Sequence, residues 1–449
     1  MKKIAFLGAS GEVTGSSFLV TAADTGEILV DLGMFQGSKE IASLNYQKLQ
    51  FNPAKLQGVV LTHAHLDHCG RLPLLVFGGF HGKVYMTAPT LALIEVVLND
   101  SAKIAEEDLK HDPLYGSDEV EKLLKMVEVV DYDTTVSFGS FQVTFRDAGH
   151  ILGSASIEIV DKGDNKKAVF SGDLGNSPED IVKPTELIES ASIVVMETTY
   201  GDKAHPAEDV SQIIQEEINI VEQKGGVLLI PAFSLERTQE LLHRIYHLKK
   251  DGKIRSEIPV FLDSPMGIRA TLIFKQFKTF YNHELQSHSD DPFSFEGLVV
   301  TEDARDSKEI IRAAEPKVII AGSGMMSGGR ILHHAVNYLG LSTTTILFVG
   351  YQAEETLGRK ILSGTKNVWI NDTQITVRAK IREIVSMSSH ADQPKLLKWL
   401  GHIKYVSQVF LVHGDTTQRQ VFAEKVTQTL GIKNVLLPEN GEEHNTTSE

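Results

Sequence analysis

Nine residues, Thr62 to Gly70, constrain this chain more than any other feature of its sequence. They read THAHLDHCG and directly follow GVVL, an apolar run typical of a buried strand. A single histidine is more often a packed or solvated side chain than a ligand, but three histidines and an aspartate at one strand end converge on a small volume. Imidazole and carboxylate groups at this spacing suit zinc and predict a metal site. The predicted ligands are His63, His65, Asp67 and His68.

The same segment favours two metal positions over one. In an extended turn His63 and His65 point one way, whereas Asp67 and His68 can turn toward a second position. Other predicted strand ends offer the donors that are still missing. These are His150 in DAGHILGS, Asp173 in FSGDLG and His413 in LVHGD.

Along the rest of the chain, short apolar runs alternate with helical patterns, which predicts an α/β protein with much parallel or mixed sheet. Because 449 residues exceed what one core usually holds, two or three structural units are expected. After residue 205, strands and helices alternate in the manner of a doubly wound domain. Its predicted strands are Val227–Ile230, Val260–Leu262, Val318–Ile320 and Ile346–Val349, and its predicted helices include Arg237–Lys249 and Gly267–Phe277. We therefore predict three segments, with 206–384 inserted between 1–205 and 385–449.

Composition bounds the location of the protein. No apolar stretch reaches the roughly 18 to 20 residues that cross a bilayer, and glycines interrupt the first apolar run before an export signal forms. Cys69, the sole cysteine, cannot form an internal disulfide. A cytoplasmic protein without membrane contact is expected, with a polar tail from Pro438 that frays.

The net charge of −15 opposes a broad electrostatic grip on nucleic acid, which normally needs a basic stripe. The objection weakens if metal cations and a few arginines in a cleft oppose the phosphate charge locally. A partner protein that supplies the basic contact is the other solution.

Taken in order, HAHLDH, GHILGS and SGDLG resemble the signature series of the metallo-β-lactamase superfamily. METTYG with Glu197, SSHAD with His390 and VHGD with His413 resemble the extra motifs of its β-CASP nucleases, a family that includes RNase J and the endonuclease subunit that cleaves pre-messenger RNA before polyadenylation. The resemblance covers the whole chain, which looks like the small prokaryotic forms without an appended RNA-binding domain. It implies a four-layer αββα fold with an inserted, doubly wound β-CASP domain.

The resemblance also implies a ligand set for two zinc ions, with manganese as a conceivable substitute. One zinc falls to His63, His65 and His150, the other to Asp67, His68 and His413, and Asp173 bridges them. Such a pair activates water and stabilises both the attacking and the leaving oxygen in phosphodiester hydrolysis. Asp67 would also orient the attacking hydroxide. Asp31 would hydrogen-bond a ligand histidine, although a simple turn aspartate is the alternative.

A leaving 3′-oxygen needs a proton, and His390 oriented by Glu197 matches that task. Each residue has a plainer alternative: Glu197 as the cap of a turn, and His390 as the cap of the following helix near Asp392. We favour the general acid.

Two further segments are candidates for binding the RNA backbone. The loop AGSGMMSGGR, with Gly324 and Arg330, offers N–H groups and a guanidinium to phosphates, or is merely a sharp turn. Ser234 and Arg237 in PAFSLERTQEL begin a predicted helix, where Arg237 can instead pair with Glu240.

The resulting prediction is a ribonuclease for single-stranded RNA that leaves 5′-phosphate and 3′-hydroxyl ends. RNA is favoured over DNA because DNA-repair members resemble one another in having an aliphatic residue where this chain has His413. The alternatives are a hydrolase of a small thioester or lactam, which shares the HxHxDH core, and a noncatalytic subunit of an RNA-processing complex, in which ligands would be missing. Internal or end-directed cutting, base preference, a homodimer and a processing partner all stay open.

Overall fold

The computed structural model describes residues 1–107, 112–178, 180–287, 289–353 and 355–446. The chain folds into two compact units, of which the first comprises 1–204, 280–282 and 389–449 and the second 205–279 and 283–388. Residues 280–282 fall inside the predicted insertion but belong to the first unit. They are held there by a bridge between Tyr281 and Val182 and by the Asn282 N–H, which donates to the carbonyl of Ile181 over 2.7 Å.

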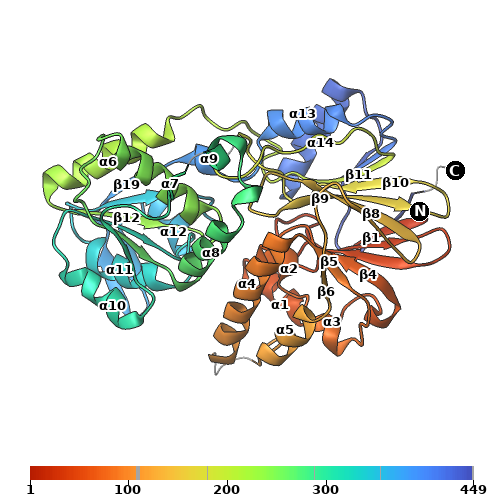
Figure 1. Ribbon diagram of the computed structural model, residues 1–449, viewed down its shortest axis with the longest axis horizontal. Helices are drawn as coiled ribbons and strands as arrows, with labels where there is room; N and C mark the ends of the chain where they lie inside the picture. The colour runs from red at the N-terminus through yellow and green to blue at the C-terminus, as the bar shows by residue number, and fades with distance from the viewer. Residues whose placement is uncertain (108–111, 179, 288, 354, 447–449) are drawn as a thin grey trace. The chain divides into compact units, whose positions relative to one another are not determined.

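In the first unit, two mixed sheets face each other (Figure 1). One has the order β22-β1-β2-β3-β4-β5-β6 and the other β21-β20-β11-β10-β9-β8-β7. The strands of the first are β1 (Lys3–Phe6), β2 (Phe18–Thr21), β3 (Glu27–Val30), β4 (Leu56–Val60), β5 (Val84–Met86), β6 (Val127–Val129) and β22 (Glu443–Asn445). Those of the second are β7 (Thr135–Phe138), β8 (Phe141–Asp147), β9 (Ala155–Asp161), β10 (Lys167–Phe170), β11 (Ile193–Glu197), β20 (Gln408–Val412) and β21 (Val435–Leu436).

A continuous apolar core joins the two sheets, since alternate residues of each strand point inward. Phe6 of β1 and Phe410 of β20 meet there with ring centroids 4.8 Å apart. The outer faces carry helices: α2 (Leu66–Cys69), α3 (Leu74–Phe77), α4 (Ala88–Glu107) and α5 (Ser117–Leu124) on one side, α13 (Gln393–His402) and α14 (Thr416–Leu430) on the other (Figure 1). The predicted αββα order is confirmed.

The predicted fraying of the tail is wrong for residues 443–446. β22 pairs with β1 in antiparallel register, and the Thr446 hydroxyl donates to the carbonyl of Met1 over 2.6 Å. His444 packs its ring against Phe6 and Phe410. Composition missed this strand because it is an edge strand, whose polar side chains face solvent.

The second unit is a doubly wound domain around a sheet of order β14-β13-β15-β12-β16-β19, in which every pair is parallel. The strands are β12 (Val227–Pro231), β13 (Val260–Asp263), β14 (Leu298–Val300), β15 (Lys317–Ala321), β16 (Thr345–Phe348) and β19 (Lys380–Glu383). The helices include α6 (Val210–Lys224), α7 (Arg237–Lys250), α8 (Pro265–Gln276), α11 (Arg330–Tyr338) and α12 (Leu357–Leu362). Figure 1 shows α6 and α7 on one side of this sheet and α11 on the other. The predicted doubly wound architecture is confirmed.

Among the described residues, none of the helices combines the length and the apolar character that a membrane span requires.

Candidate metal centre

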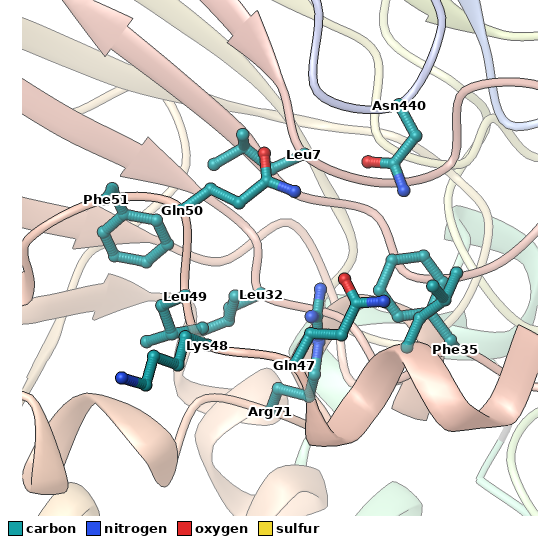
Figure 2. Close-up of a pocket in the computed structure, with 11 residues that line it drawn as sticks. Leu7, Leu32, Phe35, Gln47, Lys48, Leu49, Gln50, Phe51, Arg71 and Asn440 are labelled. Atoms are coloured by element: carbon teal, nitrogen blue, oxygen red, sulfur yellow. The ribbon is translucent and has the colours of Figure 1, made fainter.

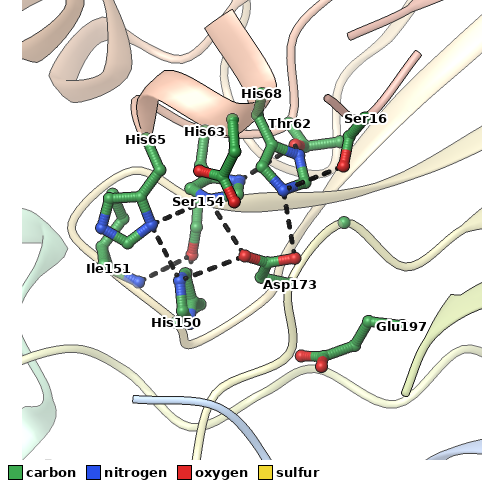
Figure 3. Close-up of polar contacts among 12 residues, drawn as sticks. Ser16, Thr62, His63, His65, His68, His150, Ile151, Ser154, Asp173 and Glu197 are labelled. Atoms are coloured by element: carbon green, nitrogen blue, oxygen red, sulfur yellow. Dashed lines mark hydrogen bonds and ion pairs between the residues drawn. The ribbon is translucent and has the colours of Figure 1, made fainter. Parts of the chain in front are cut away.

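The predicted ligands of the first unit meet where several of its strands end (Figure 3). His63 follows β4, Asp173 follows β10, Glu197 ends β11 and His413 follows β20. β10, β11 and β20 are parallel neighbours, so their carboxyl ends lie at one edge of the sheet. His150 joins them from the loop after β8.

Local structure fixes the loop that carries THAHLDH. His65 precedes α2, and its carbonyl accepts from the N–H groups of His68 and Cys69, each over 2.9 Å. The neighbouring loop comes so close that a Cβ on Gly33 would lie 1.6 Å from the carbonyl oxygen of Asp67. Gly33 in DLGMFQG is therefore required by this close approach.

Three imidazole nitrogens form the first ligand group. Nδ1 of His65 lies 3.1 Å from Nε2 of His63 and 3.2 Å from Nε2 of His150. Oδ2 of Asp173 lies 3.4 Å from His63 Nε2 and 3.6 Å from His150 Nε2. These atoms are close enough to bind a single ion.

The second group lies on the other side of Asp173. Its other oxygen, Oδ1, is 3.2 Å from Nε2 of His68 and 3.6 Å from Nε2 of His413. Oδ2 of Asp67 lies 3.3 Å from the same nitrogen of His413. Asp67, His68 and His413 again offer one ligand atom each within the range of one ion. The two oxygens of Asp173 therefore face different ligand groups.

Hydrogen bonds hold the ligand rings from behind. Nδ1 of His68 donates to Asp31 Oδ2 over 2.7 Å, as the sequence analysis expected of Asp31, and Nδ1 of His150 donates to the carbonyl of Ser389 over 3.1 Å. The hydroxyl of Ser154 accepts from the N–H groups of His150 and Ile151, which explains the serine of GHILGS (Figure 3). Such bonds fix which ring nitrogen faces the site.

Electrostatics suit cation binding. Burial lowers the pKa of His63 to about 3 and that of His65 to about 4, so both rings are neutral at pH 7, the form that binds a metal ion. Burial acts against the charge of His68 as well, but Asp173 and Asp31 outweigh it and raise the pKa of His68 well above its usual value. Buried Oδ1 of Asp173 accepts no hydrogen bond from the part of the chain that the structure describes. A bound divalent cation would satisfy that oxygen, so the residues present fit a metal.

His390 and Glu197 lie beside this cluster. Nδ1 of His390 is 3.2 Å from Oε1 of Glu197, and its Nε2 is 4.0 Å from Oδ2 of Asp173. Glu197 is buried and also accepts from the N–H groups of Leu174 and Thr199. The helix-cap alternative for His390 is wrong, because Asp392 caps α13 by accepting from the Lys395 N–H.

Two residues at the candidate metal centre have a left-handed backbone conformation, Asp31 with φ 57° and His413 with φ 48°. Non-glycine residues adopt this region at a cost of about 1–3 kcal/mol, which the surrounding structure must offset. Both turns aim a polar side chain into the site immediately after a buried strand.

A separate cavity beside Arg71, also in the first unit, has a volume of about 20 Å³ (Figure 2). The guanidinium lies 4.4 Å from the ring centroid of Phe35 and donates to Ser17 Oγ and to the carbonyl of Gly33. A space of this size holds about one water and no nucleotide. Arg71 therefore stabilises the loops behind the metal ligands.

The predicted phosphate-binding residues lie in the second unit, and the structure brings some of them together. A Cβ on Gly322 of the loop AGSGMMSGGR would lie 3.7 Å from Ser234 Oγ, and Ser234 Oγ is 3.2 Å from Ser264 Oγ. At Gly324 a Cβ would collide with the ring of Phe233. Ser264, which the sequence analysis missed, caps α8 and carries no motif signal.

The two predicted arginines already have partners. Arg237 is buried and paired with Glu240, the alternative considered from the sequence. Arg330 donates to Asp263 Oδ1 over 2.7 Å and to the carbonyl of Thr301 over 2.8 Å. Phosphate binding by either arginine stays a prediction, and these contacts reduce the number of N–H groups that each guanidinium could donate to a phosphate.

Asp263 also accepts from His334, Ser307 and Thr301. Burial raises its pKa, but these hydrogen bonds and that from Arg330 outweigh burial and lower it to about 2. The stability that follows is complete above the unfolded pKa near 3.8 and is lost as the pH falls toward 2.

Asp263→Asn is expected to destabilise the second unit by about 3 kcal/mol, because Arg330 and His334 lose a buried anion. Urea unfolding of the metal-loaded protein measures the change. Asp290→Asn removes an exposed pair with Lys250, which solvent screens, and should destabilise the protein much less. Equal losses in the two variants would mean that the Asp263 cluster carries no special stability.

Family models cover most of the chain. The metallo-beta-lactamase superfamily matches residues 10–229, the Beta-Casp domain matches 238–361, and the Zn-dependent metallo-hydrolase RNA specificity domain matches 374–438. The order agrees with the two parts of the first unit and the unit between them.

Curated relatives match over nearly the full length. Ribonuclease TTHA0252 of Thermus thermophilus is 38% identical over 92% of this chain and 93% of its own. RNase aCSPSF2 of Saccharolobus solfataricus is 31% identical over 97% of this chain and 84% of its own. Transcription termination factor FttA of Methanocaldococcus jannaschii is 29% identical over 98% of this chain and 70% of its own.

A crystal structure of a protein of unknown function from Enterococcus faecalis V583 shares the fold, with a TM-score of 0.56 and 12% identity over 99% of each chain. That likeness concerns the fold alone. The family models and the full-length relatives together confirm the resemblance drawn from the motifs: the chain belongs to the metallo-β-lactamase superfamily and, within it, to the β-CASP family.

Proposed function

We propose that this protein is a metal-dependent ribonuclease that hydrolyses phosphodiester bonds of single-stranded RNA. The observation that carries the proposal is Asp173, whose two oxygens face two separate groups of nitrogen and oxygen donors. Relatives named as ribonucleases, at 38% and 31% identity over most of the chain, support RNA as the substrate.

The cofactor proposed is a pair of zinc ions, and imidazole-rich ligands favour zinc over magnesium or calcium. His63, His65 and His150 would hold one ion, Asp67, His68 and His413 the other, and Asp173 both. Bound divalent ions would lower the pKa of water and neutralise charge on the phosphate. Manganese is a proposed substitute, since ligand type leaves part of the choice to availability.

The protein's own groups orient and move protons. Asp67, a member of the second ligand group, would orient the attacking water and accept its proton. The water oxygen attacks phosphorus, the bond from phosphorus to the 3′-oxygen breaks, and the leaving oxygen takes a proton. Hydrolysis in this direction leaves a 5′-phosphate and a 3′-hydroxyl.

His390 is proposed as the donor of that last proton. Its Nδ1–H faces Glu197, so in the protonated ring Nε2–H is directed toward the cluster around Asp173. Burial lowers the pKa of His390, but the negative charges of Glu197 and Asp173 outweigh it and raise the pKa to about 9. The charge of Glu197 thus favours the protonated ring, which is the form that a general acid requires.

Contacts between the second unit and the phosphates of the RNA backbone are the less specific part of the proposal. The hydroxyls of Ser234 and Ser264 and the N–H groups of the loop before Arg330 are suitable donors to a phosphate. With a net charge of −15, these local contacts matter more than any general attraction. The cytoplasmic location, a homodimer and an RNA-processing partner stay predictions.

The test is cleavage of a 5′-labelled single-stranded RNA by zinc-loaded protein, beside an equal-length DNA, a thioester and a β-lactam. We expect RNA fragments that disappear with a chelator and return with zinc, with little cleavage of DNA. Hydrolysis of the small molecules by folded, zinc-loaded protein that leaves RNA intact would refute the proposal. Fragment sizes distinguish internal cutting from end-directed digestion.

A further inference from the structure

Thr62, the residue before the first ligand histidine, has a fully enclosed hydroxyl. Its side chain is 1% exposed. Oγ1 lies 2.8 Å from Asp31 Oδ2 and 3.0 Å from His63 Nδ1, while the Thr62 N–H donates to Asp31 Oδ1 over 2.7 Å. Oγ1 also lies 3.3 Å from Nδ1 of His68, so the hydroxyl sits between one carboxylate and two ligand rings.

The direction of these hydrogen bonds follows from what each atom can do. A carboxylate oxygen only accepts, so the single proton of Thr62 Oγ1 goes to Asp31. The Thr62 oxygen can then only accept from His63, which places the His63 proton on Nδ1. Nε2 of His63 keeps its lone pair and faces Oδ2 of Asp173 at 3.4 Å.

Thr199 repeats this arrangement at the other ligand group. Its Oγ1 donates to the carbonyl of His413 over 3.2 Å, because a carbonyl only accepts. The same oxygen lies 3.0 Å from Nδ1 of His413, and when its own proton goes to the carbonyl it accepts from that nitrogen. In this tautomer Nε2 of His413 carries no proton and faces Asp67 Oδ2 at 3.3 Å.

In these tautomers Nε2 of His63 and Nε2 of His413 are unprotonated and each faces a carboxylate oxygen. Two hydrogen-bond acceptors then lie opposite each other. This arrangement is unfavourable unless a cation lies between them. The two threonines thus prepare His63 and His413 for metal before metal arrives, at opposite oxygens of Asp173.

We propose that Thr62 and Thr199 are positioning residues which fix the Nδ1–H tautomer of one histidine in each metal-ligand group. The inference rests on the proposed metal ligands and adds the two hydroxyls that set their donor atoms. Thr62 acts through Asp31, which also accepts from His68 Nδ1 over 2.7 Å, so one carboxylate orients a ligand in each group.

Valine has the shape of threonine without the hydroxyl, so it separates this role from packing. In Thr62→Val, His63 Nδ1–H loses its acceptor, and in Thr199→Val, His413 Nδ1–H does. Each variant should bind one of two cobalt(II) ions about 10- to 100-fold more weakly, whereas Thr62→Ser and Thr199→Ser should bind as the wild type does. Thr198→Val is the matched control, because the hydroxyl of buried Thr198 donates to the carbonyl of Val412 and forms no hydrogen bond with a ligand ring among the described residues.

The measurement is a cobalt(II) titration of the metal-free, full-length protein, with the visible absorption of bound cobalt and a competing chelator as readouts. Circular dichroism of the metal-free variants checks that each is folded. Valine variants that match Thr198→Val in cobalt affinity, or serine variants that bind as poorly as valine, would overturn the inference. If wild-type protein binds no cobalt, the proposed metal centre itself fails, which is a different result.

Discussion

Asp173→Asn is expected to reduce the rate of RNA cleavage by about 10³-fold or more. Asparagine keeps the shape of the side chain but loses the negative charge and one of the two oxygens that face the ligand groups. A loss of about 4 kcal/mol in transition-state stabilisation, within the range of metal-assisted catalysis, corresponds to this factor. Single-turnover cleavage of a labelled RNA measures it.

Metal content measured on the same samples shows whether Asp173→Asn loses activity through weaker binding. Asp133→Asn serves as the matched control in the same unit, since Asp133 forms an exposed pair with Arg146. That control should retain both metal and activity. An Asp173→Asn protein with near wild-type activity would remove the central residue of the proposal.

His390→Ala should lower kcat by about 10²- to 10⁴-fold, the usual contribution of a general acid. Metal content should stay unchanged, because the proposed role of His390 is proton donation and not metal binding. Its ring also lies within ligand range of Asp173 and His413, so the metal analysis decides between the two roles. Loss of a metal ion from His390→Ala would assign the residue to the metal centre instead.

The pH dependence of the cleavage rate also tests the assignment of His390 as the general acid. A general acid must be protonated, so the rate falls as the pH rises through the pKa of His390. The charge of Glu197 raises that pKa, so Glu197→Gln should lower it and move the fall in rate to lower pH. A profile that keeps its position in Glu197→Gln would contradict this pairing.

Much of the candidate metal centre was predictable because its proposed ligands occupy strand ends with compact local motifs. THAHLDH alone supplies four side chains, and the buried strands before His63, Asp173 and His413 have strong apolar signals. The doubly wound unit was predictable for the same reason, since its central strands are continuous apolar runs.

Other features depend on contacts between distant segments of the sequence. Asp263 meets His334 across 71 residues, and no local pattern marks either of them. The roles of the Thr62 and Thr199 hydroxyls can be inferred only when their hydrogen-bond partners are known. The edge strand β22 is half solvated, so its composition resembles that of a loop.

The most direct test of the account is the rate of RNA cleavage against zinc added to metal-free protein, from none to three equivalents per chain. The account predicts little cleavage at one equivalent and full activity at two, with no further gain at three. Full activity with a single equivalent, or activity that persists in a strong chelator, would contradict a centre in which Asp173 serves two ions.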